Sequence, residues 1–380
     1  MKNMCRNFVF HGQGYWIFLF LLLIFISADA FAQKDTGKKK PEYDVDFGVA
    51  VVYDDNILKY SEKYLERFLN NEDKGRFHID TYDDIIISPD LNLSATCYIF
   101  GKQRSVFDVD ASYSKYAVNN VKTWSNFGIG YRQYISSKLN FKVFYDYIPE
   151  FYVRHFRDDD WTDVYGFRAD NTFTPYVFTK NNYGTWIQYS IFKNTRFRLY
   201  YYYSQYYHNK HYTEYDSKNS LYRFKVWQRF LDDFTFEFTY QYIYSDAKGY
   251  DKPGEDKETS DDGDATYEED GFVFGLMYRL PRIKKRYHTL EFETVIYNRY
   301  YKTEKSVIVD RLHAGRVDNN LRFYITYYLS ATRNWKFKAF YRWLGRDSGT
   351  TSVLNEEFVS NEKDYIQNQV GIELIYRFGF

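Results

Sequence analysis

The sequence predicts an all-β protein: a transmembrane antiparallel up-and-down β-barrel of about 14 strands, after a cleaved N-terminal signal peptide. Three observations predict it. Aromatic residues make up 22% of 380 residues, yet the mean hydropathy is −0.62. Apolar and polar residues alternate along many segments, and short connections alternate with long ones. This combination is typical of strands that face lipid on one side and water on the other. It excludes helical membrane proteins and disordered chains.

The N-terminus has the features of a secretory signal peptide. Lys2 and Arg6 precede an apolar stretch at 16–26, and Ala30-Phe31-Ala32 is a small-x-small cleavage site. The apolar stretch is too short to cross a bilayer comfortably, although an uncleaved anchor is the alternative. The predicted division of the chain is a signal peptide at 1–32, a short periplasmic lead at 33–42 and an outer-membrane β-barrel at 43–380.

The charge balance bears on possible partners, and the cysteine content bears on what holds the chain together. The chain has 51 Lys+Arg and 51 Asp+Glu, and this balance gives no reason to propose a nucleic-acid partner. After cleavage Cys97 is the one remaining cysteine, so an intrachain disulfide cannot form. We therefore expect a closed barrel, without disulfides, to hold the exported chain together.

Fourteen segments alternate with period two, which is the pattern of a strand with two different faces. In the first, residues from Tyr43 to Tyr53 place Val45, Phe47 and Val49 on one face and Asp44 on the other. The predicted strands are 43–53, 83–99, 105–117, 123–135, 139–149, 182–192, 196–207, 220–230, 234–245, 271–280, 287–300, 319–329, 335–344 and 365–380.

The last segment, VGIELIYRFGF, has one wholly apolar face that ends in Tyr376, Phe378 and Phe380. It resembles the C-terminal recognition signal of bacterial outer-membrane β-barrel proteins. That resemblance implies recognition by the barrel assembly machinery and contact with periplasmic chaperones. An edge strand of a soluble sandwich is the alternative, but it does not explain why the same pattern recurs along the chain.

Connections of alternating length predict short periplasmic turns and long outer loops, with both termini on the periplasmic side. The short ones are 101–104, 136–138, 193–195, 231–233, 281–286 and 330–334. The long ones are 54–82, 150–181, 246–270, 301–318 and 345–364, with shorter members at 118–122 and 208–219.

The inward residues are polar, which predicts a hydrated lumen, and their charges are unevenly placed. The predicted acidic wall is Asp44, Asp46, Asp90, Asp108 and Asp110. The predicted basic wall is Arg198, Arg223, Lys225, Arg229, Arg279, Arg299, Arg322, Lys336, Lys338 and Arg342. In a ring of fourteen strands the two walls face each other, which would set a transverse field across a pore. The alternative is that these charges pair and hydrate a narrow or plugged lumen.

The sequence gives weaker indications of ligand binding, metal binding or catalysis. Inward tyrosines could stack on flat solutes or simply fill the lumen, and the acidic loop 251–270 could bind divalent cations or simply be solvated. His208 and His211 are two potential metal ligands without a third, and His155 is the one histidine near a strand end that could serve catalysis. No hydrolase or nucleotide-binding motif is present. We therefore predict no enzyme activity, no cofactor and no metal site.

Residues Tyr53-Asp54-Asp55-Asn56-Ile57 resemble the Tyr-Asp-x-Asn-Ile/Val motif of the β-barrel porin type 2 family. The run 84–93 and the Gly101-Lys102 turn resemble that family's second strand and the turn after it. The barrel of surface-lipoprotein assembly modifiers is similar, but this sequence lacks their N-terminal helical repeat domain. The resemblance implies a porin-like barrel and no defined substrate.

Together these observations predict an outer-membrane porin-like channel for small hydrophilic solutes in a Gram-negative bacterium. The expected partners are outer-membrane lipid, the barrel assembly machinery (through the C-terminal strand), periplasmic chaperones and small solutes. The alternative is a surface-exposed barrel that acts in binding, assembly or export through its long outer loops rather than as a pore.

Overall fold

The computed structural model describes residues 41–72, 75–100, 103–158, 161–162, 165–166, 170–283 and 286–379. The predicted signal peptide, most of the periplasmic lead, the Gly101-Lys102 turn and Phe380 lie outside the described residues.

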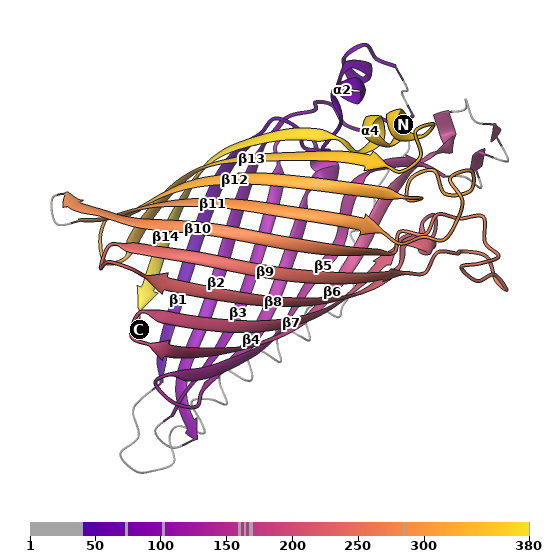
Figure 1. The fold of residues 1–380 in the computed structure, drawn as a ribbon. Coiled ribbons are helices and arrows are strands. Elements are labelled where there is room, and N and C mark those ends of the chain that lie inside the picture. The colour runs from indigo at the N-terminus through magenta and orange to yellow at the C-terminus, as the bar shows by residue number, and fades with distance from the viewer. Residues whose placement is uncertain are drawn as a thin grey trace, which may run out of the picture.

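Fourteen antiparallel strands close into one barrel in chain order, with β1 paired to β14 (Figure 1). The predicted strand count and fold are therefore confirmed. The strands are β1 (Glu42–Asp54), β2 (Asp84–Phe100), β3 (Gln103–Tyr116), β4 (Trp124–Tyr134), β5 (Leu139–Arg157), β6 (Phe173–Phe192), β7 (Thr195–His208), β8 (Ser217–Arg229), β9 (Phe234–Ala247), β10 (Tyr267–Ile283), β11 (Arg286–Tyr301), β12 (Arg316–Ser330), β13 (Trp335–Thr350) and β14 (Tyr365–Gly379).

The long connections gather at one end of the barrel, the loop end, and the short ones at the other, the turn end (Figure 1). β1 begins and β14 finishes at the turn end, since Asp44 lies opposite Gly379. The predicted alternation of short and long connections is thus confirmed. Closure leaves no strand edge unpaired, which is what a sheet needs in lipid, where no water can satisfy its backbone.

The predicted loop 150–181 was largely wrong. β5 and β6 continue through much of it, with Phe151 opposite Phe178 and Arg157 opposite Phe173. The register shifts after Ile148, beside Glu150, whose φ is 45°. Such a bulge reverses which residues face the lumen, so the period-two pattern breaks there although the strand goes on.

The loops in which the sequence predicted no regular structure contain the helices α2 (Glu62–Leu69) and α4 (Glu356–Lys363). Ser61 caps α2 by accepting a hydrogen bond from the Tyr64 amide. Among the described residues, three short 3-10 helices also lie at the loop end: η1 (Asn120–Lys122), η2 (Asp170–Thr172) and η3 (Thr213–Tyr215). No helix within the described residues is long and apolar enough to cross a membrane.

The predicted faces of the strands are also confirmed. On β14, Val370, Ile372 and Leu374 keep 54%, 52% and 47% of their surface exposed. On β1, Phe47 is 44% exposed, whereas the alternate residue Gly48 is buried against Asp90. Soluble proteins do not present a continuous apolar band of this kind to water. The outer face therefore suits a lipid bilayer, and the inner face encloses a polar lumen.

Candidate functional site

A cavity of about 1400 Å³ runs from the loop end deep into the lumen. It reaches Tyr328 and Lys338, which lie two and three residues from the ends of β12 and β13 at the turn end. Of the described residues that line it, fourteen are Lys or Arg and ten are Asp or Glu. The cavity is thus polar, spans most of the barrel and carries an excess of positive charge.

The first part of the first long loop folds into the loop end of the lumen, whereas α2 projects away from the barrel (Figure 1). In this mouth loop (residues 55–72 and 75–83), Ile57, Leu58 and Tyr60 are 4%, 4% and 1% exposed. Their partners are inward side chains of five strands: Val52, Ile86, Tyr116, Tyr152 and Phe340. The mouth loop therefore narrows the entrance by burying apolar side chains against the barrel wall.

The Tyr-Asp-Asp-Asn motif fastens the mouth loop to β14. Asp54 accepts hydrogen bonds from the side chains of Gln367 and Gln369, at 2.7 and 2.8 Å. Asp55 accepts from both the backbone and side-chain amides of Asn368, at 2.6 and 2.7 Å. These charge-assisted bonds join the first strand to the last where the barrel closes. The resemblance identified the motif, but the sequence did not indicate this clamping role.

Asn56 completes the clamp and is 2% exposed. Its Oδ1 accepts from the Tyr60 amide at 2.8 Å. Its Nδ2 donates to the carbonyl oxygens of Tyr60 and Ile366, at 2.9 and 2.8 Å. One side chain thus holds the turn of the mouth loop closed and ties it to β14.

The structure places the acidic-wall residues on neighbouring strands, close against the wall. Asp46 accepts from Nε of Arg377 at 2.6 Å, and Asp108 pairs with Lys142 at 2.6 Å. Asp90 lies over Gly48 and Asp110 over Gly128, the residue directly opposite each in the sheet. Asp44 is exposed at the turn end. Two of the five carboxylates therefore have a cationic partner within the wall.

The basic-wall residues fall into three groups. Lys225, Arg299 and Lys338 form ion pairs with Glu237, Glu269 and Glu373 on adjacent strands. Arg198, Arg223, Arg322 and Arg342 contact amide oxygens or aromatic rings. Arg229, Arg279 and Lys336 are exposed toward the turn end. Five of the ten line the cavity: Arg223, Lys225, Arg299, Lys338 and Arg342.

Several aromatic side chains point into the lumen although the alternation did not single them out. Phe144 lies over Gly184 and Phe340 over Gly371, each directly across the sheet. A Cβ on either glycine would lie inside the van der Waals radius of the ring. An inward glycine opposite an inward aromatic residue is the signal that could have revealed these pairs.

The inward tyrosines Tyr200, Tyr202, Tyr324 and Tyr328 have different surroundings. Tyr324 and Tyr328 line the cavity. Tyr200 stacks on Tyr202 with ring centroids 5.9 Å apart, and its hydroxyl accepts from Nη1 of Arg198 at 2.8 Å. Tyr200 and Tyr202 thus take part in packing and hydrogen bonding within the wall.

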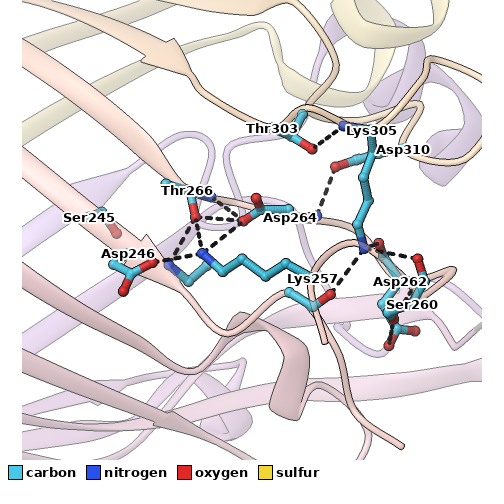
Figure 2. Close-up of polar contacts among 12 residues, drawn as sticks. Ser245, Asp246, Lys257, Ser260, Asp262, Asp264, Thr266, Thr303, Lys305 and Asp310 are labelled. Atoms are coloured by element: carbon cyan, nitrogen blue, oxygen red, sulfur yellow. Dashed lines mark hydrogen bonds and ion pairs between the residues drawn. The ribbon is translucent and has the colours of Figure 1, made fainter. Parts of the chain in front are cut away.

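Two lysines organise the acidic loop between β9 and β10 (Figure 2). Lys257 donates to Asp246 at 2.7 Å and to Thr266 at 3.0 Å. Lys305, from the next loop, donates to the carbonyl oxygens of Gly249, Ser260 and Asp262. Carboxylate oxygens of Asp251, Glu255 and Asp262 lie within 4.8 Å of one another. The loop is therefore held by one lysine of its own and one lysine of the next loop, and its Asp251 and Asp262 line the cavity.

Histidines at the loop end have protein partners. His208 and His211 pair with different carboxylates, Asp216 at 3.3 Å and Asp158 at 2.7 Å. His155 contacts the Tyr152 hydroxyl at 2.7 Å and stacks on His78 with centroids 3.6 Å apart. The two histidines of the HNKH segment therefore do not share a ligand site.

Glu214 of η3 is a buried carboxyl in the cavity lining and is 8% exposed. Burial, reinforced by nearby aspartates, raises its pKa to about 9. It is therefore neutral at physiological pH, which adds to the positive balance of the cavity.

A closed antiparallel barrel with an apolar outer face, a polar lumen and long loops at one end is the architecture of bacterial outer-membrane proteins. The chain therefore has the architecture of an outer-membrane β-barrel.

Solved structures of such barrels are similar over most of the chain. An anion-selective porin from Comamonas acidovorans has 8% identity and a TM-score of 0.44, with 89% of this chain and 99% of that one covered. The outer membrane channel DcaP of Acinetobacter baumannii has 11% identity and a TM-score of 0.44, with 90% and 100% covered. A bacterial polysaccharide outer membrane secretin has 9% identity and a TM-score of 0.45, with 88% and 98% covered. No family model matches the sequence, and neither does any curated protein.

Proposed function

We propose that this barrel is an outer-membrane channel for small hydrophilic solutes. The observation that carries the proposal is the cavity of about 1400 Å³, which extends from the loops to Tyr328 and Lys338 near the turn end. A polar cavity through a closed barrel is how porins admit water-soluble solutes. The mouth loop narrows this path, so we expect a channel selective for small solutes rather than a wide, general pore.

We further propose that the lumen has a transverse field. Asp90, Asp108 and Asp110 lie on β2 and β3, and the cavity lining on the opposite strands contains Arg223 and Lys225. Local ion pairs reduce the field but leave an excess of cations along the cavity. Charged walls of this kind set ion selectivity in other channels.

Planar-bilayer recording of the purified protein tests both proposals. We expect discrete conductance steps. Under a salt gradient, we expect the reversal potential of the triple variant R223Q/K225Q/R229Q to shift toward cation preference. The control is K193Q, which removes an exposed positive charge at the β6–β7 turn, away from the cavity lining. Absence of steps would overturn the channel and favour a barrel that acts through its loops. Steps with unchanged selectivity in the triple variant would overturn the field.

We also infer that the C-terminal strand is the segment through which the barrel assembly machinery recognises the chain, after delivery by periplasmic chaperones. The outward row of β14, which includes Tyr376 and Phe378, supports this inference because it presents an apolar, aromatic edge before closure.

A further inference from the structure

We propose that Lys59, Lys122, Arg154 and Lys363 form an anion-binding site at the loop end of the cavity. The ligands would be small solutes that carry phosphate or carboxylate groups. The claim that such anions are transported rests on the proposed channel, whereas the claim that they bind does not.

Four separate segments bring these side chains to one cavity. Lys59 lies in the mouth loop, Lys122 in η1, Arg154 near the end of β5 and Lys363 at the end of α4. Arg154 and Lys363 face the same ring, Phe156, at 5.2 and 5.0 Å from its centroid. Arg154 also donates to the carbonyl oxygen of Lys59 at 3.4 Å. The four cations are therefore neighbours, although they are far apart in the sequence.

The contacts that the protein gives these cations are neutral. Lys122 donates to the carbonyl oxygens of Tyr152 and Val153, at 3.0 and 3.1 Å. Lys59 lies 5.5 Å from the ring centroid of Tyr365. Within the part of the chain that the structure describes, none of the four forms an ion pair with a carboxylate.

Arg154 gives the most direct indication of a ligand. Its side chain is 4% exposed, and its Nε and Nη1 have no hydrogen-bond partner among the described residues. A buried guanidinium that leaves two donors unused is costly, because water no longer satisfies them. An oxyanion in the cavity, which Arg154 lines, would offset this charge and accept from one of the two donors, because Nε–H and Nη1–H point to different sides of the guanidinium.

The carboxylates nearest to the cluster are already engaged. Glu362 pairs with Arg76 at 3.4 Å and accepts from the Tyr64 hydroxyl. Asp54 is held by Gln367 and Gln369 in the clamp of the mouth loop. Burial, together with repulsion from Lys59 and Arg154, lowers the pKa of Lys122 to about 7. The cluster is therefore short of negative charge, and a bound anion would supply it.

Lys59 is also held in an unusual backbone conformation, with φ of 54°. This left-handed region favours glycine, since a Cβ there approaches the following carbonyl oxygen. The chain places a lysine at this position and directs its charge toward the cavity. Strain of this kind is common where a side chain must be presented to a ligand.

Binding and conduction can be measured separately. Calorimetric titration of the refolded protein in detergent with inorganic phosphate reports the site, and planar-bilayer recording reports the channel. We expect phosphate to bind the wild type and K193Q equally, and to bind R154Q and K363Q at least about tenfold more weakly, the loss of one charge-assisted hydrogen bond. R154K, which keeps the charge, should retain most of the affinity. Heat-dependent gel migration shows that each variant is folded.

The outcomes are distinguishable. Phosphate that binds R154Q and K363Q as tightly as the wild type, or that does not bind the wild type, overturns the site whatever the conductance. Phosphate binding without conductance supports the site and overturns the channel. If R154Q does not fold, K363Q at the end of α4, which lines the same cavity, carries the test by itself.

Discussion

Replacing Asn56 with alanine should release the mouth loop from the lumen. The side chain makes three hydrogen bonds, to the amide and carbonyl of Tyr60 and to the carbonyl of Ile366, all between 2.8 and 2.9 Å. Each buried neutral hydrogen bond contributes about 0.5–1.5 kcal/mol, so N56A should cost about 2–4 kcal/mol of docking free energy. That cost shifts the ratio of docked to released loop by about 30-fold or more.

The assays for N56A are tryptic cleavage in the mouth loop and single-channel conductance. Cleavage within α2, after Lys63 or Arg67, should become faster, and conductance should rise because the apolar side chains of the loop leave the entrance. N194A, at the exposed β6–β7 turn, is the matched control and should behave as the wild type. Wild-type cleavage and conductance in N56A would refute the idea that this side chain holds the constriction.

Three further predictions concern the wall, a loop and assembly. In G371A the new Cβ displaces the Phe340 ring into the lumen, so conductance should fall and the free energy of unfolding should drop by about 1–3 kcal/mol. Adding F340A to G371A should restore conductance. Burial raises the pKa of Glu214 to about 9, so the folded loop binds this proton more tightly than the unfolded loop, and its resistance to proteolysis should fall as pH rises toward 9. Proteolysis measured over a series of pH values checks this trend, which should be absent in E214Q. F380A should lower the amount of barrel assembled in the outer membrane without changing secretion into the periplasm, as fractionation would show; unchanged assembly would count against recognition through this strand.

Much of the fold could be predicted because each strand separates two solvents. Alternation on β14, from Val370 to Phe378, marks the lipid face directly, and closure follows because a sheet in lipid cannot leave an edge unpaired. The prediction was wrong where β5 passes Glu150, because a bulge there reverses which residues face the lumen and so resembles the end of a strand.

The candidate site was harder to predict, because alternation along a strand shows which residues face the lumen but not what fills it. Which residues face the lumen follows from period two, and the charged walls were obtained in this way. What fills the lumen does not, because the burial of Ile57 and Tyr60 depends on a loop folding back across the barrel. The cluster of Lys59, Lys122, Arg154 and Lys363 likewise combines residues from three loops and one strand that no local pattern relates.

Accessibility of a single lumen residue to a charged thiol reagent tests the central claim most directly. Thr326 lines the cavity, and its neighbour Ile325 is 41% exposed on the outer face. In a Cys97→Ser background, T326C should lose conductance in steps when a membrane-impermeant thiol reagent is added, whereas I325C should not. Equal currents before and after modification of T326C would show that the cavity is not the path of conduction.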